Sequence, residues 1–452
     1  KALQQLANYH RQTLKTPIIG VTGTNGKTTT KELMAAVLTR KYNLLYTQGN
    51  LNNHIGVPLT LLRLTKEHQL AVVEMGASHP GDIKELVDIA EPDFGIITNV
   101  GRAHLQGFGS FEGVIRTKGE LYDYLRSKGN ATIFIQNENT YLNNIAGNLN
   151  CVRYGQTPGL FVSGEMVDCS PFLKFRWTAE GASHDVQTSL IGAYNLDNVL
   201  AAVAIGRYFK VEDKDICDAI ASYVPTNNRS MLKKTDDNTL IVDAYNANPT
   251  SMMEALKNFQ HIDAPHKMAI LGDMKELGEA SKEEHQKIAD YLSNCGLERI
   301  ILVGSEFKST NHPGTVLDDV EQVKAELQNH KPQGFYILVK GSNSTKLLKG
   351  YVDYWIIQSY GRVSSLDYYE EPHKFIITEN FESYSASGGR LLEQARYMPN
   401  HGYKGGVGAY RVDNDYDNKP DYKWMRQAIR INQETFQQWK EQQGKTEESN
   451  NN

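Results

Sequence analysis

A glycine-rich stretch near the N-terminus constrains the fold more than any other feature of this chain. Residues 20–30 read GVTGTNGKTTT and follow the short apolar run Pro17-Ile18-Ile19. Apolar residues then recur at the i,i+4 spacing of a helix, as in the pair Leu33 and Val37. The pattern therefore predicts a strand, a glycine loop and a helix, an arrangement that holds phosphate at the helix N-terminus.

The residue types of this loop suit a nucleotide phosphate. Glycines let backbone N–H groups turn inward without a Cβ clash. Lys27 is expected to reach the outer phosphates and the Thr28 hydroxyl to bind Mg²⁺. The loop is a variant of the strict pattern, because Val21 stands where that pattern has its first glycine. The predicted nucleotide contacts are Gly23, Thr24, Asn25, Gly26, Lys27, Thr28 and Thr29.

Length and composition exclude several classes of protein. A chain of 452 residues is long enough for two or three domains. Its formal charge of −5 argues against a nucleic-acid partner, which requires a basic face. No apolar run approaches the roughly 18 residues of a membrane span. The four cysteines lack metal-ligand spacing, so we expect a reduced, cytoplasmic protein.

Two later strands are predicted to end in polar groups. The apolar run 70–74 ends in Glu74, and the run 94–100 is followed by His104. In doubly wound α/β folds ligands lie at the carboxyl ends of strands, so Glu74 is a candidate Mg²⁺ ligand. His104 is a candidate ligand or orienting group beside the metal. The alternative, that His104 is an ordinary loop histidine, stays open.

The rest of the first half predicts a β-rich elaboration of the same domain. A helix is expected over 111–125, carrying Lys118, and an alanine-rich helix over 199–208. Asn195 and Asn198 lie at i,i+3 where the second helix starts, so one can cap it while the other faces a ligand. Between these helices, antiparallel-looking strands are predicted at 131–135, 152–154, 160–167, 172–177 and 184–190.

Beyond a hinge at 225–229, strands and helices alternate again. Two loops there, 243–249 and 272–278, could close onto the nucleotide, although turns commonly contain such residues. The predicted fold class is α/β: a central doubly wound, mostly parallel P-loop sheet with a β-rich elaboration, a smaller Rossmann-like domain and an irregular C-terminal extension. The predicted strands of the second domain are 239–242, 267–271, 299–303 and 335–339. The expected boundaries are 1–15, a linker helix, 16–226, 227–354 and 355–452.

Together these motifs resemble those of the Mur ligases, ATP-dependent amide-forming enzymes that build the peptidoglycan peptide. The loops 245–249 and 271–278 resemble the branch that adds D-alanyl-D-alanine to a UDP-muramoyl-tripeptide. The resemblance covers residues 3–354 and rests on Gly23 to Thr28, Glu74 to Ala77, Asn99 to Gly101 with His104 and Leu105, Lys118 to Glu120, Asn195 with Asn198, Arg229, Asp243 to Pro249, Gly272 to Gly278 with His285, and Lys340 to Ser342.

The resemblance implies a mechanism and roles for single residues. A peptide carboxylate attacks the γ-phosphate of ATP, and the resulting acyl phosphate is attacked by the D-alanyl-D-alanine amine. Implied catalytic residues are Lys27, Lys118, His104 and Arg229. Implied Mg²⁺ ligands are Thr28, Glu74, His104 and Lys118, the last carbamylated by CO₂. Implied nucleotide contacts are Asn195, Asn198, Asp243 and Asn246. Implied substrate contacts are Asn248, Asp273, Glu276, His285, Lys340 and Ser342.

Departures from the family pattern leave alternatives open. Tyr194 stands where many relatives have histidine, and Asn343 where they have arginine. The family's N-terminal domain, which grips the uridine nucleotide, has no counterpart here, so we expect ATP binding with weak ligation. A relative such as folylpolyglutamate synthetase and an ATP-binding scaffold remain alternatives. We expect a monomer and assign no function to residues 355–452.

Overall fold

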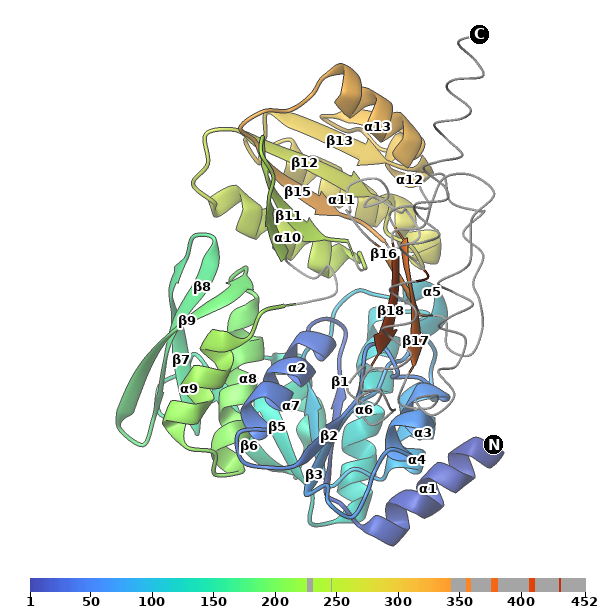
Figure 1. Cartoon of the computed structure of the whole chain (residues 1–452), viewed down its shortest axis with the longest axis vertical. Coiled ribbons are helices and arrows are strands. Elements are labelled where there is room, and N and C mark those ends of the chain that lie inside the picture. Colours follow the sequence, from blue (N-terminus) through green and yellow to red (C-terminus); the bar gives the residue numbers. More distant parts are fainter. Residues whose placement is uncertain are drawn as a thin grey trace. The chain divides into compact units, whose positions relative to one another are not determined.

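A computed structural model describes residues 1–225, 231–244, 246–342, 355–358, 375–380, 406–410 and 431. The chain separates into two compact units, residues 1–347 and 348–452. The first unit contains two sheets, and we call residues 1–225 the large lobe and residues 231–342 the small lobe (Figure 1). Arg229 and Asn343, named above, lie outside the described residues.

The large lobe is built on a nine-stranded sheet of order β2-β3-β1-β4-β5-β6-β7-β8-β9. Neighbours are parallel from β2 to β7, and β7, β8 and β9 are antiparallel. The strands are β1 (Ile18–Thr22), β2 (Leu44–Tyr46), β3 (Leu70–Glu74), β4 (Phe94–Ile97), β5 (Thr132–Gln136), β6 (Asn150–Gly155), β7 (Val162–Cys169), β8 (Phe172–Ala179) and β9 (Ala182–Ile191). β1 lies between β3 and β4, which is where a doubly wound sheet places its ligand.

The antiparallel prediction is wrong for β5 and β6 and confirmed for β7 to β9. Helix α7 (Thr140–Ala146) connects β5 to β6, and a crossover of this kind returns the chain in the same direction. Only tight turns follow β7 and β8, so those strands reverse. A run of strand-like residues alone cannot distinguish these two connections.

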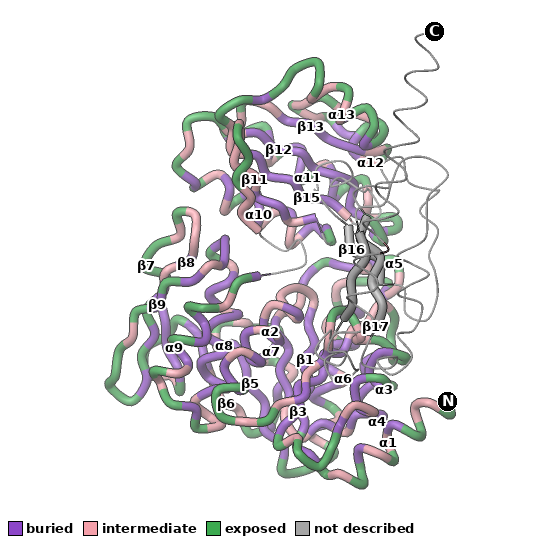
Figure 2. Tube along the Cα trace, viewed as in Figure 1, coloured by how far each residue is buried: buried purple, intermediate pink, exposed green. Residues whose placement is uncertain are grey.

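Helices cover both faces of the large sheet because its strands alternate between two cores. Ile19 and Val21 pack in one core with α2 and α8, whereas Ile18 packs in the other with α4 and α6. Figure 2 shows the central strands as buried. The helices are α1 (Ala2–Leu14), α2 (Lys27–Leu38), α3 (Gly56–Leu61), α4 (Asp82–Ala90), α5 (Leu105–Phe108), α6 (Phe111–Lys128), α8 (Asn195–Tyr208) and α9 (Asp213–Ser222).

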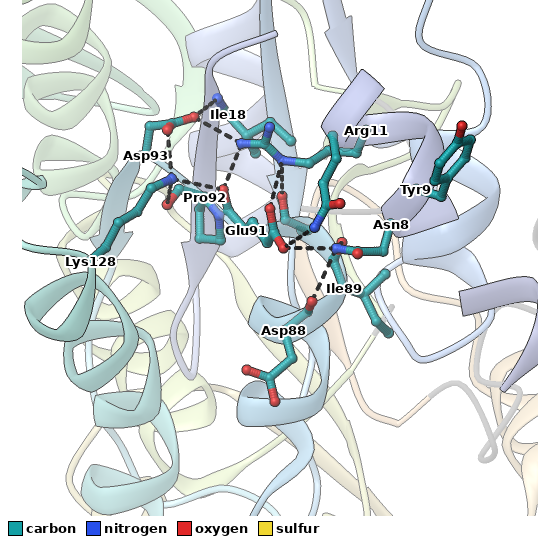
Figure 3. Close-up of polar contacts among 12 residues, drawn as sticks. Asn8, Tyr9, Arg11, Ile18, Asp88, Ile89, Glu91, Pro92, Asp93 and Lys128 are labelled. Carbon is teal, nitrogen blue, oxygen red and sulfur yellow. Dashed lines mark hydrogen bonds and ion pairs between the residues drawn. The ribbon is translucent and has the colours of Figure 1, made fainter. Parts of the chain in front are cut away.

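Polar contacts fasten α1 to the rest of the large lobe (Figure 3). The buried Arg11 guanidinium donates to the carbonyl oxygens of Ala90 and Glu91, both at 2.8 Å, at the C-terminal end of α4. It also contacts Asp93 at 3.2 Å, and Asp93 accepts from Lys128 at 2.6 Å. A cation is favourable at the negative end of a helix dipole. The network therefore holds α1 against the large lobe.

The small lobe is a six-stranded sheet of order β10-β11-β15-β12-β13-β14, with β10 antiparallel and the other strands parallel. Its elements are β10 (Met231–Lys234), β11 (Thr239–Asp243), α10 (Pro249–His261), β12 (Lys267–Gly272), η1 (Gly278–Ala280), α11 (Ser281–Leu292), β13 (Arg299–Val303), α12 (Ser305–Lys308), β14 (Thr315–Leu317), α13 (Val320–Asn329) and β15 (Tyr336–Lys340). The four predicted strands are confirmed. Two short edge strands, β10 and β14, carry too little apolar pattern to be predicted.

Apolar contacts join the two lobes. Leu105 and Phe108 of the large lobe belong to the same buried cluster as Met274 and Leu277 of the small lobe. These residues lie on the segments that follow β4 and β12. The strand ends that carry the predicted motifs are thereby brought to a common region.

Residues 348–452 form a separate unit, of which three short strands are described. They are β16 (Trp355–Gln358), β17 (Phe375–Asn380) and β18 (Gly406–Tyr410), paired in parallel. These short strands lie within the expected C-terminal extension. In the described parts of the chain, no helix is both long enough and apolar enough to cross a bilayer.

Candidate functional site

A cavity of about 650 Å³ lies at the ends of β1 and β3 and is lined by both lobes. Its lining includes fourteen residues that the sequence motifs predict: Thr24, Asn25, Gly26, Lys27, Thr28, Thr29, Glu74, His104, Asn195, Asn198, Asp243, Asn246, Asn248 and Lys340. Motifs up to three hundred residues apart in sequence therefore meet at one site.

Close packing shapes the glycine loop between β1 and α2. A Cβ on Gly23, whose φ is 143°, would lie 2.0 Å from Thr98 Oγ1. A Cβ on Gly26, whose φ is 78°, would lie 2.5 Å from Asn198 Oδ1. The Lys27 ammonium donates to the carbonyl oxygens of Gly23 at 2.8 Å and of Thr24 at 2.9 Å. The loop is thus curled around Lys27, with the first residues of α2 lining the cavity.

Glu74 is held at the end of β3 with one oxygen engaged. Its Oε1 accepts from the Thr28 hydroxyl at 3.2 Å and from the Asn52 amide at 2.8 Å. The Lys31 ammonium lies 3.8 Å from Oε2, and no hydrogen bond from the described residues reaches that oxygen. A carboxylate beside a hydroxyl suits Mg²⁺, which commonly binds one or two carboxylates together with phosphates and water. The pair therefore fits the predicted metal.

His104 and Lys118 each contact groups other than Glu74. Within the described ranges, no group of three or more His, Cys, Asp or Glu side chains could hold a metal ion. The His104 Nδ1 contacts the Glu276 carboxylate of the small lobe. Lys118 donates to the Ala77 carbonyl at 3.4 Å, and its ammonium lies 5.5 Å from the centre of the Phe108 ring. Metal binding by His104 and Lys118 stays a prediction.

Burial shifts the protonation equilibria of both side chains. It holds the pKa of Lys118 well below its usual value, and the nearby positive charge of Lys27 lowers this pKa further. Burial is also the main cause of the lowered pKa of His104, although the carboxylate of Glu276 opposes it. Both environments therefore favour the neutral side chain.

Asn195 and Asn198 form a buried chain of amides at the start of α8. Asn195 Nδ2 donates to the Ile191 carbonyl at 2.8 Å, and Asn198 Nδ2 donates to Asn195 Oδ1 at 2.9 Å. The helix N-cap is Tyr194, and its side chain makes no capping bond. The expectation that one asparagine caps α8 is therefore wrong, because their amides bond to Ile191 and to each other.

The small lobe contributes Lys340 and residues that follow β11 to the cavity. Lys340, buried at the end of β15, donates to Asp243 Oδ2 at 2.6 Å and to the Asn246 carbonyl at 3.3 Å. These two bonds hold the loop that follows β11. Asn248, the N-cap of α10, lies next to Asn25 of the glycine loop.

Other predicted substrate residues have internal partners and do not line the cavity. His285 Nε2 accepts the Met274 N–H at 3.0 Å, and its Nδ1 donates to the Ser281 carbonyl at 2.7 Å. Asp273 accepts the N–H groups of Glu306 and Phe307 at 3.3 and 3.2 Å. Asp273, Glu276, His285, Ser342 and Lys118 are all absent from the lining. A role for them toward substrate stays untested.

Asn99 and Asn52 are among the lining residues that were missed as site residues. Asn99 Oδ1 accepts the Asn25 N–H at 3.0 Å, so it holds the glycine loop from the end of β4. Asn52 holds Glu74. The sequence signal for Asn99 was present, since it lies at the polar end of the predicted strand 94–100. Asn52 lies in a run rich in asparagine, and because turns commonly contain asparagine, this run gave no specific signal.

Comparison with known proteins gives concordant matches. Residues 21–206 match the Mur ligase middle domain and residues 228–343 the Mur ligase, glutamate ligase domain. The UDP-N-acetylmuramoyl-tripeptide–D-alanyl-D-alanine ligase of Bacillus subtilis is 38% identical over 306 residues, 67% of this chain and 66% of that protein. The Escherichia coli ligase of the same name is 33% identical, over 76% of this chain and 78% of that protein.

Solved structures agree with these matches. MurF from Acinetobacter baumannii has a TM-score of 0.69 and 31% identity, covering 76% of this chain and 78% of that one. MurF ligase from Thermotoga maritima in complex with ADP has a TM-score of 0.69 and 28% identity, covering 76% and 81%. Folylpolyglutamate synthase from the same organism, at 12% identity and a TM-score of 0.54, shares the fold alone. The chain thus spans about two thirds to four fifths of these relatives.

Proposed function

The chain belongs to the Mur ligase family, and on that basis we propose that it joins D-alanyl-D-alanine to a UDP-N-acetylmuramoyl-tripeptide in an ATP-dependent reaction. One observation carries the proposal: the glycine loop, Glu74 and the polar loop that follows β11 line a single cavity. Relatives at 33 and 38% identity carry the name of that ligase.

The reaction has two bond exchanges. A carboxylate oxygen of the tripeptide attacks the γ-phosphorus of ATP, and the bond from that phosphorus to the bridging oxygen of ADP breaks. The D-alanyl-D-alanine nitrogen then attacks the acyl carbon, inorganic phosphate leaves, and the nitrogen loses a proton. Positioning and charge neutralisation drive such phosphoryl transfer. Lys27 and the N-terminal N–H groups of α2 would supply both at the phosphates.

Thr28 and Glu74 would hold Mg²⁺, since they place a hydroxyl and a carboxylate oxygen next to the loop that would bind phosphate. When bound, the ion would neutralise phosphate charge and orient the γ-phosphate. Asn52 and Lys31 would keep the Glu74 carboxylate oriented. His104 would remain near Lys27, whose charge contributes to the lowered pKa of the imidazole.

Lys118 would carry a carbamate formed with CO₂. The neutral amine is the form that attacks CO₂, and burial at 2% exposure favours that form. The amine nitrogen would bond to the carbon of CO₂ and lose a proton, which converts a buried neutral amine into an anion that can support a metal or position the tripeptide. The test is a ¹³C carbamate resonance in protein equilibrated with ¹³C-bicarbonate. The resonance should be absent from Lys118→Arg, and its absence from wild type would refute the modification.

The function is tested by phosphate release from ATP with Mg²⁺, UDP-muramoyl-tripeptide and D-alanyl-D-alanine, each omitted in turn. Release that requires every component supports the ligase, and the ligated product is identified by mass. Release with folate and glutamate in place of the muramoyl substrates would instead favour a folylpolyglutamate synthetase. ATP binding without any turnover would favour a binding protein. We also propose cytoplasmic localisation and a monomer, which fractionation and sedimentation would test.

A further inference from the structure

Asn25, in the middle of the glycine loop, is held from several directions. Its N–H donates to Asn99 Oδ1 at 3.0 Å. Its carbonyl accepts from the Thr98 hydroxyl at 2.6 Å and from Asn99 Nδ2 at 3.1 Å. These backbone bonds come from the end of β4, within the large lobe. They leave the side-chain amide as the part of Asn25 that reaches another lobe.

The Asn25 amide meets the amide of Asn248 across the two lobes. Asn248 Nδ2 donates to Asn25 Oδ1 at 2.7 Å, and Asn25 Nδ2 approaches Asn248 Oδ1 at 3.4 Å. Primary amides carry donors and an acceptor, so two of them can pair reciprocally without any charge. A neutral pair does not compete with phosphate for Lys27, which lies two residues further on.

Capping of α10 sets the orientation of the Asn248 side chain. Asn248 is the N-cap of α10, and its Oδ1 accepts the Ser251 N–H at 2.9 Å. The Ser251 hydroxyl in turn accepts the Asn248 N–H at 3.2 Å, which completes a capping box. The cap directs Oδ1 into the helix, so the NH₂ group points at the glycine loop. Asn248 is 6% exposed, which leaves its amide little room to rotate.

We propose that the Asn25–Asn248 amide pair is a positioning device that ties the conformation of the glycine loop to the docking of the small lobe. This inference rests on the proposed function insofar as the loop is taken to bind ATP. Through the pair, the start of α10 supports the loop that would hold the phosphates, although neither side chain needs to react. Asn25 and Asn248 are thus positioning residues for phosphoryl transfer.

A different cross-lobe contact provides a matched control. The Arg102 guanidinium lies 3.3 Å from Glu284 Oε1, and its side chain is 51% exposed. This ion pair joins the same two lobes but makes no contact with the glycine loop. Arg102→Ala removes the ion pair and keeps the backbone bond from the Arg102 N–H to the Thr250 hydroxyl at 3.1 Å.

The decisive variant is Asn248→Ser. Serine is a good N-cap residue, so the cap of α10 persists, but its side chain is too short to reach Asn25. We expect the unfolding midpoint to stay close to that of wild type. Hydrogen exchange in the nucleotide-free protein should become several-fold faster at residues 23–28, and the dissociation constant of a non-hydrolysable ATP analogue should rise about tenfold.

Asn25→Ser and the double variant complete the test. If the two amides act as a pair, the double variant raises the dissociation constant of the ATP analogue no more than either single variant does. The proposal is overturned if Asn248→Ser leaves hydrogen exchange at residues 23–28 unchanged, or if it changes exchange and affinity no more than Arg102→Ala does. It is also overturned if the increases in dissociation constant caused by the two single variants multiply in the double variant. Exchange in the nucleotide-free protein does not depend on ligation. A wild-type chain that fails to ligate would therefore count against the proposed function and not against the pair.

Discussion

Two strand–loop–helix units of this molecule look alike in sequence and differ in what their loops bind. In the large lobe, the glycine loop joins β1 to α2, and its residues line the cavity. In the small lobe, residues 273–280 join β12 to α11, and two polar groups of that unit bond inward. Asp273 takes the N–H groups at the start of α12, and His285 takes the Met274 N–H.

A polar loop at a strand end is a ligand site only where its donors face a cavity. His285 is 0% exposed and Asp273 is 1% exposed, so both serve the packing of the small lobe. Glu276 of this second loop has a φ of 63°, and its side chain contacts His104 of the large lobe. Variants on the two loops should therefore fail in different ways, one in catalysis and the other in folding.

The largest expected effect belongs to the glycine loop. Lys27→Ala should lower kcat by about 10²–10³-fold, because a preorganised cation at the transferring phosphate is lost. The free energy of unfolding should fall by about 1 kcal/mol, since the contacts removed include hydrogen bonds to two loop carbonyls. Phosphate release and urea unfolding measure the two quantities.

The matched control for this variant is Lys84→Ala, which removes an exposed helix lysine paired with Asp88. It should change neither quantity measurably. Wild-type turnover in Lys27→Ala would contradict the view that the glycine loop serves catalysis and residues 273–280 serve folding.

The second loop should show the opposite pattern. His285→Ala leaves the Met274 N–H without its acceptor in a buried place and opens a cavity, so the free energy of unfolding should fall by about 2–4 kcal/mol. The folded fraction should still bind an ATP analogue with nearly wild-type affinity. Calorimetry and equilibrium binding test this. A stable variant with lost affinity would instead place His285 in the binding site.

A smaller effect is expected at the proposed metal position. Thr28→Val keeps the shape of the side chain but removes the hydroxyl that bonds to Glu74, so about tenfold more Mg²⁺ should be needed for half-maximal turnover. Thr28→Ser restores the hydroxyl and should stay within threefold of wild type. Titration of turnover with Mg²⁺ measures this requirement, and equal requirements in the two variants would contradict a role of the hydroxyl.

The smallest effect concerns pH. Burial lowers the pKa of His285 from its ordinary 6.5. Below about pH 6.5 the unfolded chain therefore binds a proton at His285 more readily than the folded protein does. The free energy of unfolding falls as the pH falls. The stability advantage of wild type over His285→Ala should shrink by about 1 kcal/mol between pH 7 and pH 5. Urea unfolding at both values measures this, and a constant difference would show that the pKa of His285 is the same in the folded and the unfolded chain.

Much of the fold was predictable because it rests on local patterns. The apolar run before Glu74 is β3, and the run before Gly272 is β12, as expected. The direction of β5 and β6 was not predictable, because it depends on whether the intervening segment forms a crossover helix. Asn52 was missed for a similar reason: its function is defined by a bond to Glu74, twenty-two residues away.

Residue types at short spacing in the sequence predict the glycine loop, its strand and helix, and the order of two α/β lobes. Which polar loops form the site depends instead on long-range packing. Asn248 meets Asn25 across 223 residues of chain, whereas Asp273 and His285 turn into their own lobe. Hydrogen-bond partners so far apart in sequence are chosen by packing, and no local pattern records that choice.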